Sequence, residues 1–362
     1  MTKTLLMSLG MLVCINTSYS VRDEQNITSD TRLLVIGAFA HHGPAFYEAE
    51  LKRCHEILSG DPDNFDARND LGAALTKLRR YEEAEAEFQQ NEQLHPGRYQ
   101  TASNLGVLYK KWDRFEDASE WIAKALEIKP GGHMGLGDYY LRMINWKAEH
   151  ARAGGLPPTN FLGVKYTAGP HATAKVANRE YVETLIKNDM SFADAYLVLG
   201  DIALFEDDLQ TALRSYLRAT QISGVSHSGR VQRVYARLEE KMPDQVHAAQ
   251  TEWPNQIHTE FNTAEAWLTR YQEIEAERIE SGQAVDFETM REATAVAGLQ
   301  APVVKMVTYD EQDQSPTGRI AKWGMILSVL GGISLAIVVA GLFFIRRIFM
   351  SPKADAEVVL DR

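Results

Sequence analysis

The sequence predicts an all-α protein, in which a solenoid of helical hairpins is followed by one transmembrane helix. Two observations support this fold class. Residues of the same kind recur 34 positions apart between residues 65 and 132, and a fixed period of this length indicates stacked helical units. Residues 323–345 then form an apolar run of 23 residues without a charge, and about 20 such residues cross a bilayer as a helix.

The composition is that of an ordinary folded protein. Apolar residues make up 45% of the chain and charged residues 24%, as in typical globular domains. The formal net charge is −11. Because nucleic-acid binders carry a basic surface, this charge argues against a nucleic-acid partner.

The N-terminus, residues 1–20, has the layout of a secretory signal peptide. Lys3 precedes an apolar run at residues 5–15, and small residues follow. The run is too short to span a bilayer. A helix of the protein core is the alternative interpretation. We expect residues 21–44 to be an extended segment that leads into the helical region.

Residues 65–132 contain two copies of one pattern. Leu71–Gly72 matches Leu105–Gly106, and Ala84 matches Ala118, each pair 34 residues apart. Helix–turn–helix units with this period and this pattern resemble the tetratricopeptide repeat family. The physical reason for the pattern is close packing, since glycine on the first helix and alanine on the second let the two backbones approach.

A third copy follows after an interruption. Leu199–Gly200, Ala212 and Tyr216 fall on the same positions of the pattern. The interruption is rich in glycine and proline, and long insertions in compact arrays tend to be functional. We expect repeats at 65–98, 99–132 and 193–226, a leading half-repeat at 45–64, and a split repeat at 133–192 that contains an insertion at 151–172.

The leading half-repeat contains Cys54, the single cysteine that remains once the signal peptide is removed. No intrachain disulfide is therefore expected. The period places Cys54 at a large core position, so we interpret it as a buried structural thiol.

Residues 227–299 no longer match the pattern, although residues 230–241 and 265–281 have helical character. We interpret this region as degenerate or capping helices, which a solenoid needs at its open end. Residues 300–322 contain many polar residues and are typical of a stalk.

The predicted transmembrane helix, residues 323–345, is followed by a tail at 346–362. Because a signal peptide directs the N-terminal part out of the cytoplasm, we expect the repeats outside and the tail inside. A buried helix of a soluble core is the alternative. Export without a disulfide framework and the short tail suggest a bacterial envelope protein, periplasmic in a Gram-negative cell.

Small residues recur every four positions along the transmembrane helix. Such a stripe permits close helix–helix approach in lipid and indicates a possible homo-oligomer. The stripe consists of Gly324, Ser328, Gly332, Ala336 and Ala340.

The resemblance implies a concave groove that is lined by the first helix of each repeat. Its polar and charged residues suit an extended peptide or a partner helix, and solubility alone is the alternative explanation. The clamp by which co-chaperones of this family hold a C-terminal carboxylate is not present, because only Asn104 matches it. The residues expected to line the groove are Asp66, Asn69, Thr76, Lys77, Gln100, Ser103, Asn104, Lys110, Lys111, Asp194, Leu197, Asp201 and Phe205.

His41 and His42 are the one local cluster with metal-ligand character. Adjacent side chains on an extended segment point to opposite faces, and zinc sites need three or four ligands. No nucleophile elbow, zinc-protease motif or phosphate loop occurs in the sequence. We therefore expect no enzyme and no cofactor, and we predict a membrane-anchored scaffold that binds a protein or peptide. The alternative is a metal-binding or enzymatic site formed by His41, His42 and residues 133–172.

Overall fold

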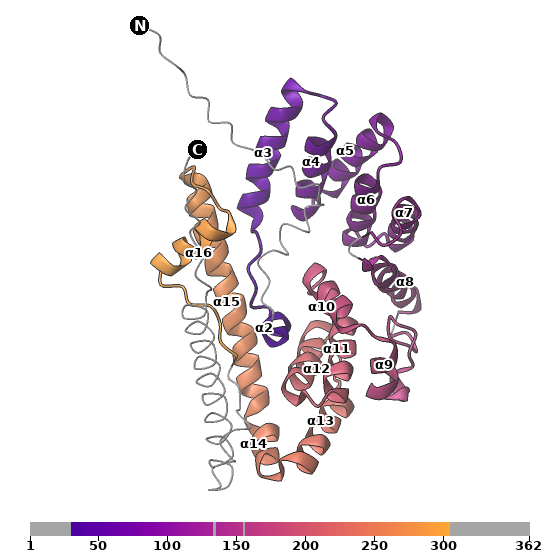
Figure 1. Ribbon diagram of the computed structural model, residues 1–362, viewed down its shortest axis with the longest axis vertical. Coiled ribbons are helices and arrows are strands. Elements are labelled where there is room, and N and C mark those ends of the chain that lie inside the picture. Colours follow the sequence, from indigo (N-terminus) through magenta and orange to yellow (C-terminus); the bar gives the residue numbers. More distant parts are fainter. Residues whose placement is uncertain (1–29, 133–134, 155, 305–362) are drawn as a thin grey trace, which may run out of the picture. The chain divides into compact units, whose positions relative to one another are not determined.

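The computed structural model describes residues 30–132, 135–154 and 156–304, and this part of the chain is helical without any strand (Figure 1). The predicted all-α fold class is thus confirmed for the described residues. The helices are α2 (Thr31–Ile36), α3 (Pro44–Gly60), α4 (Phe65–Lys77), α5 (Tyr81–Leu94), α6 (Tyr99–Lys111), α7 (Phe115–Ile128), α8 (Gly137–Ala153), η2 (Tyr166–Ala168), α9 (Pro170–Val176), α10 (Arg179–Asn188), α11 (Ala193–Phe205), α12 (Leu209–Ser223), α13 (Ser228–Lys241), η3 (Pro243–Gln245), α14 (Val246–Thr251), α15 (Trp253–Glu280) and α16 (Phe287–Val296).

The predicted signal peptide at 1–20 and the predicted transmembrane helix at 323–345, with its stripe of small residues, lie outside the described residues. So do the tail and most of the predicted stalk. Within the described ranges, no helix is both long enough and apolar enough to cross a membrane.

Three hairpins of the same form, α4–α5, α6–α7 and α11–α12, occupy the predicted repeats. A Cβ atom at Gly106 would lie 2.5 Å from the Ile122 side chain, and one at Gly200 would lie 2.4 Å from the Tyr216 ring. Gly72 is enclosed in the same way by an aromatic ring of α5. Glycine is therefore required at this position because each second helix packs directly on the backbone of the first.

The turn between the two helices is also the same in each hairpin. Arg79, Asp113 and Asp207 adopt positive φ angles of 61°, 58° and 63°. The following N–H donates to the carbonyl five residues earlier in each case, which is the Schellman motif that ends many helices. Left-handed backbone costs a non-glycine residue roughly 1 kcal/mol, so this turn is a strained feature that recurs in all three hairpins.

Helix α3 packs against α4 as the leading half-repeat predicts. The Cys54 side chain is fully buried there. Burial raises the pKa of its thiol to about 12, so the thiolate that would react with oxidants is not populated at neutral pH. The interpretation of Cys54 as a structural thiol is confirmed.

Residues 21–44 were expected to be extended, and this is wrong for residues 31–36. Residues Thr31–Ile36 form helix α2, and the side chain of Asp30 caps it by accepting a hydrogen bond from the Arg32 N–H. Leu34 and Ile36 are buried because α2 packs on α10 and α12. The apolar run that begins at residue 33 would otherwise remain in water, which is the physical reason for the difference.

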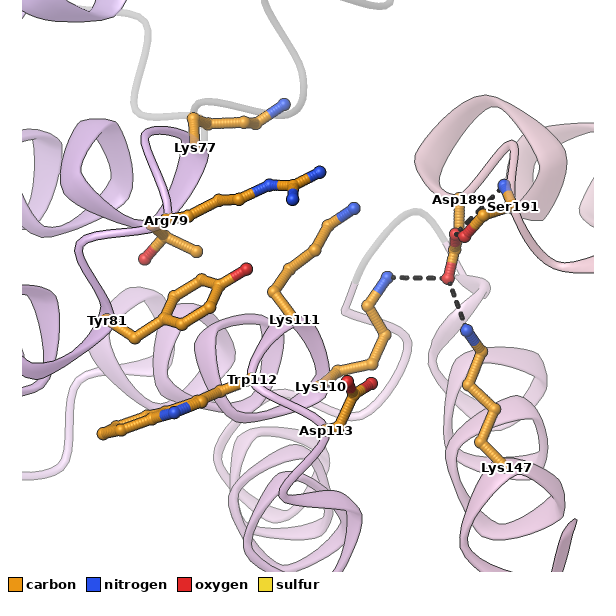
Figure 2. A pocket seen from close by; sticks show the side chains of 11 residues that line it. Lys77, Arg79, Tyr81, Lys110, Lys111, Trp112, Asp113, Lys147, Asp189 and Ser191 are labelled. Carbon is orange, nitrogen blue, oxygen red and sulfur yellow. Dashed lines mark hydrogen bonds and ion pairs between the residues drawn. The ribbon is translucent and has the colours of Figure 1, made fainter. Parts of the chain in front are cut away.

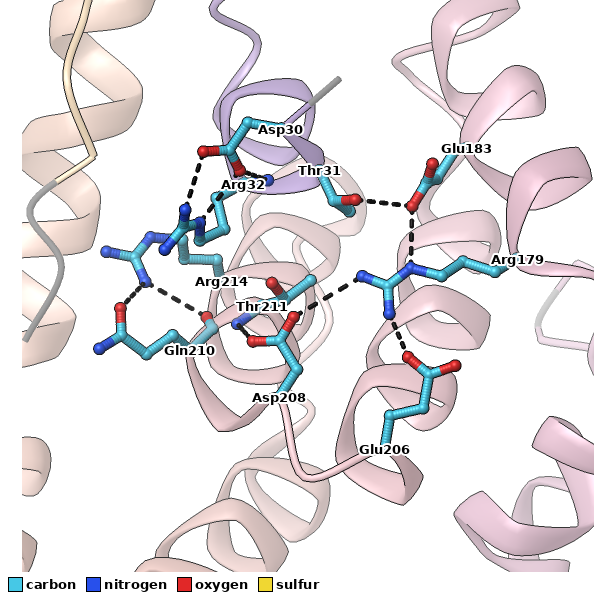
Figure 3. Close-up of polar contacts among 10 residues, drawn as sticks. All are labelled: Asp30, Thr31, Arg32, Arg179, Glu183, Glu206, Asp208, Gln210, Thr211 and Arg214. Atoms are coloured by element: carbon cyan, nitrogen blue, oxygen red, sulfur yellow. Dashed lines mark hydrogen bonds and ion pairs between the residues drawn. The ribbon is translucent and has the colours of Figure 1, made fainter. Parts of the chain in front are cut away.

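Polar contacts at the ends of this interface hold α2 in place (Figure 3). Thr31 Oγ1 donates to Glu183 Oε1 of α10 at 2.7 Å, and Arg179 pairs with the same carboxylate at 2.9 Å. Arg214 of α12 forms a buried double hydrogen bond with Glu260 of α15, at 2.8 and 2.9 Å. The N-terminal segment is thus attached to α10 by a hydrogen bond and to α12 by packing, and both helices lie far from it in the sequence.

The C-terminal region contains a longer helix than the sequence predicted. The helical stretch predicted at 265–281 begins twelve residues earlier, since α15 runs from Trp253 to Glu280. Helix α15 packs on α12 and on α2 and α3 (Figure 1). It therefore joins the end of the repeat array to its beginning, which a cap on the last repeat alone would not do.

Candidate functional site

A cavity of about 560 Å³ opens where the C-terminal ends of α4 and α6 face α8 and the turn between α10 and α11. Its volume is within the usual range of ligand sites, about 300–1,000 Å³. We call it the basic pocket. It is lined by Thr76, Lys77, Arg79, Tyr81, Lys110, Lys111, Trp112, Asp113, Lys147, Asp189 and Ser191.

Local helix physics explains why cations gather here. Lys77, Lys110 and Lys111 occupy the last turns of α4 and α6, where the partial negative charge of the helix end favours a cation. Because the two hairpins stack, their helix ends converge and bring these lysines together. Five cations and two carboxylates line the pocket, so it has an excess of three positive charges in a chain whose net charge is −11.

Asp189 compensates two of the cations (Figure 2). Its Oδ2 atom lies 3.2 Å from Lys110 Nζ and 2.9 Å from Lys147 Nζ. Ser191 Oγ donates to its other oxygen at 2.6 Å. Lys110 is 3% exposed and Asp189 4%, so this ion pair belongs to the wall of the pocket rather than to its free surface.

The charges of the pocket shift two pKa values in the direction expected from their neighbours. Burial raises the pKa of Asp189, but the positive charges of Lys110 and Lys147 outweigh it and hold the pKa well below its usual range. The positive charge of Lys110, followed by burial, lowers the pKa of Lys111 to about 8. Lys111 is thus a cation that lacks enough negative charge around it.

Three cations face the open side of the pocket. The side chains of Lys77, Arg79 and Lys111 are exposed and point into the same space in Figure 2. Within the part of the chain that the structure describes, neither Arg79 nor Lys111 forms an ion pair with a carboxylate. Lys77 lies over the ring of Tyr47, 5.6 Å from its centroid.

An aromatic pair forms one side of the same pocket. The rings of Tyr81 and Trp112 are stacked, with centroids 5.8 Å apart and planes inclined by 29°. Both residues are half-buried, and Figure 2 shows them beside Arg79 and Lys111. The pocket therefore offers an aromatic surface next to its cations, which suits a ligand with both apolar and anionic groups.

The third hairpin presents a different surface, because the chain covers it with its own insertion. Asp194 of α11 accepts hydrogen bonds from the Phe161 N–H at 2.7 Å and from Tyr166 Oη at 2.6 Å. Asp201, two helical turns further along α11, accepts a hydrogen bond from Thr173 Oγ1 of α9 at 3.0 Å. Both carboxylates are 2% exposed. We call this surface the occupied groove.

The carboxylates of the occupied groove also bind within the hairpin and to α13. Tyr216 Oη donates to Asp201 at 2.8 Å, and Arg230 pairs with Asp201 at 3.2 Å. Burial raises the pKa of Asp194 to about 6. Asp194 and Asp189 are both buried carboxylates, yet their pKa values shift in opposite directions because only Asp189 faces lysines.

The predicted groove residues fall into two groups. Lys77 and Lys111 line the basic pocket, while Asp66 is exposed and Gln100 half-exposed elsewhere on the first helices. Thr76 and Lys110 also line this pocket but are buried in its wall, and Phe205 is exposed beside the insertion. The remaining residues are buried or half-buried by packing or by the insertion. They are Asn69, Ser103, Asn104, Asp194, Leu197 and Asp201.

Several buried members of that set bind other parts of the protein. Thr76 Oγ1 donates to the Gly72 carbonyl at 2.8 Å, and Asn104 donates to Asn69 at 3.4 Å. Thr76 thus binds the backbone of its own helix, and Asn104 of α6 binds the neighbouring first helix, α4.

The pocket residues that sequence reasoning missed come from the turns and from outside the matched repeats. Arg79, Tyr81 and Trp112 lie in or beside the hairpin turns, and Lys147 and Asp189 belong to the split repeat. The one available signal was the recurrence of a charged residue at the turn position, 34 residues apart, at Arg79 and Asp113.

The histidine pair is engaged by protein groups. His42 Nδ1 pairs with Glu275 Oε1, and the Gly43 N–H donates to Glu275 Oε2 at 2.8 Å. The His42 ring also stacks on Phe46, with 3.6 Å between centroids. Within residues 30–132, 135–154 and 156–304, no group of three or more His, Cys, Asp or Glu side chains is arranged to hold a metal ion.

One comparison with known proteins gave a match. A family model described as tetratricopeptide repeat matches residues 99–131, which is the α6–α7 hairpin. No curated protein matches the chain. The matched repeat and the two further hairpins of the same form support a tetratricopeptide-repeat protein, a class whose members are generally non-enzymatic scaffolds for protein–protein interaction.

Proposed function

We propose that this protein is a scaffold that binds a partner protein through the basic pocket, where the C-terminal ends of α4 and α6 lie side by side. The observation that supports this most is that Arg79 and Lys111, which form no ion pair with a carboxylate of the described residues, lie beside the half-buried aromatic pair of Tyr81 and Trp112. Charged side chains without a nearby opposite charge, on the concave surface of a repeat protein, are typical of a partner-binding site.

We further propose that residues 323–345 anchor the protein in a membrane and that the repeats face the extracytoplasmic side. The support is in the sequence: an apolar run of 23 residues without a charge, and a signal-peptide layout at residues 1–20. Protease added to intact cells after removal of the outer envelope should degrade the repeats but spare a C-terminal tag. Protection of the repeats would contradict this orientation.

The stripe of small residues in that segment supports self-association. A Gly332→Ile substitution should then abolish any oligomer seen by crosslinking in membranes, because the larger side chain prevents close helix approach. An unchanged oligomer would exclude the stripe as its interface.

The scaffold proposal is tested by crosslinked pull-down from membranes. The pocket variant carries Arg79→Asn and Lys111→Gln. Asparagine tolerates the left-handed backbone at residue 79, so this variant should fold normally. The control variant carries Arg142→Asn and Lys175→Gln, which remove one exposed arginine and one exposed lysine outside the pocket.

The expected result is that a specific partner captured by the natural protein is lost, by about tenfold or more, from the pocket variant alone. Equal capture by the two variants would reject this surface as the binding site. Lys110 is left unchanged because its ion pair with Asp189 is buried, and its loss would destabilise the fold as well as the site.

A further inference from the structure

Residues 30–43 connect the two walls of the basic pocket, and we call this segment the strap. One wall consists of the C-terminal ends of α4 and α6, and the other consists of α8 and the turn between α10 and α11. The strap contains α2, which packs on α10 and α12, and it continues directly into α3, which packs on α4. It is therefore attached to both sides of the pocket.

The first attachment leads through α10 to the pocket. Thr31 Oγ1 of α2 donates to Glu183 Oε1 of α10 at 2.7 Å (Figure 3). Helix α10 has ten residues and is followed directly by Asp189, which pairs with Lys110 and Lys147 in the pocket wall. A helix of this length extends about 15 Å and moves as a rigid element. A displacement of α10 at Glu183 is therefore passed on to Asp189.

The second attachment leads through α3 to the opposite wall. His42 pairs with Glu275 of α15, and the Gly43 N–H donates to the same carboxylate at 2.8 Å. The His42 ring also lies edge-on to the Tyr47 ring of α3, with 6.4 Å between centroids. Lys77, which lines the pocket, lies over that ring, with its Nζ atom 5.6 Å from the centroid. A continuous series of contacts thus joins the end of the strap to the α4 wall.

The docking of α2 has two states. Leu34, Val35 and Ile36 are buried against α10 and α12, and detachment exposes their apolar surface to water. With six residues, α2 is too short to be helical in water by itself. It is therefore either docked and helical or detached and unfolded.

Two other connections limit how far the walls move without the strap. Lys110 of α6 pairs with Asp189 of the opposite wall, and α15 packs on both α12 and α3. Detachment of α2 therefore does not separate the walls. It removes the hold at Glu183, so that α10 and the turn after it sample several positions relative to α4 and α6.

We propose that the strap fixes the width of the basic pocket. Docked α2 holds the two walls at the spacing that binds the partner, and detached α2 leaves that spacing variable and the binding weaker. This inference rests on the proposed scaffold function and adds a means of regulating its site. By thermodynamic linkage, a partner that bridges the walls stabilises the docking of α2 to the same degree.

The test measures the distance between the walls by double electron–electron resonance on the full-length chain in detergent. Nitroxides are attached to Glu82→Cys on α5 and Glu180→Cys on α10, two exposed positions that do not line the pocket. Cys14 is replaced by serine, and the buried Cys54 is not accessible to the label. This measurement does not require the partner to be known.

Variants of α2 provide the perturbation. Leu34→Asp places a charge in a buried site and should detach α2, and Leu34→Ala should detach a smaller fraction. Hydrogen exchange in residues 31–36 measures that fraction, so Leu34→Ala decides the test if Leu34→Asp is not recovered as folded protein. The control is Tyr166→Phe, which removes one hydrogen bond between the insertion and α11 and leaves the strap unchanged.

The distance distribution should shift or broaden by more than about 2 Å, the size of a loop or domain rearrangement, as α2 detaches. It should stay unchanged in the control. In the membrane pull-down, capture of the partner should fall about threefold or more with Leu34→Asp, because fewer molecules have the binding conformation. An unchanged distribution or unchanged capture, with α2 detached, would overturn the proposal.

The two proposals fail in different ways. If detachment of α2 changes the distance but capture does not depend on Arg79 and Lys111, the proposed binding site fails and the control of the pocket width stands. If capture depends on these two residues but the distance does not respond to the detachment of α2, only the role of the strap fails.

Discussion

The first two repeats and the third repeat have the same hairpin, the same strained turn and the same glycine beneath the second helix, yet they present opposite surfaces. Lys77, Lys111 and Phe205 occupy one equivalent position at the end of the first helix. The two lysines face an open pocket, whereas Phe205 contacts His171 of the insertion at 5.1 Å between ring centroids. Whether a groove position is open to a partner thus depends on which other segment of the chain packs over it.

The buried carboxylates make the same distinction in their electrostatics. Asp189, beside the open pocket, is held ionised by lysines, while Asp194, under the insertion, has a raised pKa because of burial. Substituting the buried, hydrogen-bonded Asp201 of the occupied groove should destabilise the fold, whereas removing the charge of the exposed Lys111 in the open pocket should leave the fold stable. The predictions that follow test this difference, from the largest expected effect to the smallest.

The largest effect is expected for Asp201→Ala in the occupied groove. The change leaves Arg230 without its buried partner and removes the acceptor of the Tyr216 and Thr173 hydroxyls. Breaking a buried ion pair of this kind costs about 3–5 kcal/mol, to be measured by urea denaturation of the full chain in detergent. The Asp201→Asn variant keeps an acceptor and should lose less. A loss below about 1 kcal/mol for alanine would contradict the tight attachment of α9.

The second prediction concerns pH and Asp194. Its pKa is about 6 in the folded protein and near 3.8 in the unfolded chain, so the folded state binds more protons between these values. This group therefore stabilises the fold at low pH, and its contribution is lost as pH rises from about 4 to about 6, by roughly 3 kcal/mol. The difference in unfolding free energy between the natural protein and Asp194→Asn should follow this curve. A flat difference would contradict the burial of an ionisable Asp194.

A smaller effect is expected for Tyr166→Phe, which removes one of the two hydrogen bonds from the insertion to Asp194. The Phe161 N–H remains as a donor. We expect a loss of about 1 kcal/mol, with faster hydrogen exchange in residues 156–176 and unchanged exchange in α4 and α6. A spread of the effect to α4 and α6 would show that the insertion supports the open pocket as well.

The smallest effect is expected for Lys111→Gln in the open pocket, and its sign is reversed. Because the pKa of Lys111 is lowered to about 8, the folded state binds fewer protons than the unfolded chain between about pH 8 and 10.5, and stability rises with pH in that window. The variant should lack this rise and be equal to or up to about 1 kcal/mol more stable than the natural protein at pH 7, since solvent screens this exposed side chain. A clear destabilisation would mean that Lys111 has a structural partner.

Much of the fold could be predicted because the repeat is a local pattern. Gly72 and Gly106 are recognisable in the sequence because they lie one period of 34 residues apart, and Gly200 is recognisable because the same pattern surrounds it. Helix α2 could not be predicted in this way. Its burial depends on α10 and α12, about 150 residues further along the chain, and no period connects them.

The candidate site was predictable only in part for the same reason. Lys77 and Lys111 follow from their repeat positions, but Asp189 and Lys147 enter the pocket from the split repeat, where the period is interrupted. Nor did the sequence indicate that the insertion would cover Asp194 and Asp201, because such covering is a tertiary contact between segments without a shared pattern.

Photocrosslinking at equivalent positions tests the central claim most directly. A benzophenone amino acid is placed at residue 77, beside the open pocket, or at residue 205, beside the insertion, and the full-length protein is irradiated in its native membranes. Both positions are exposed, so reagent access is matched. A specific partner adduct from residue 77 and none from residue 205 is the predicted result. An adduct from residue 205 alone would contradict the account.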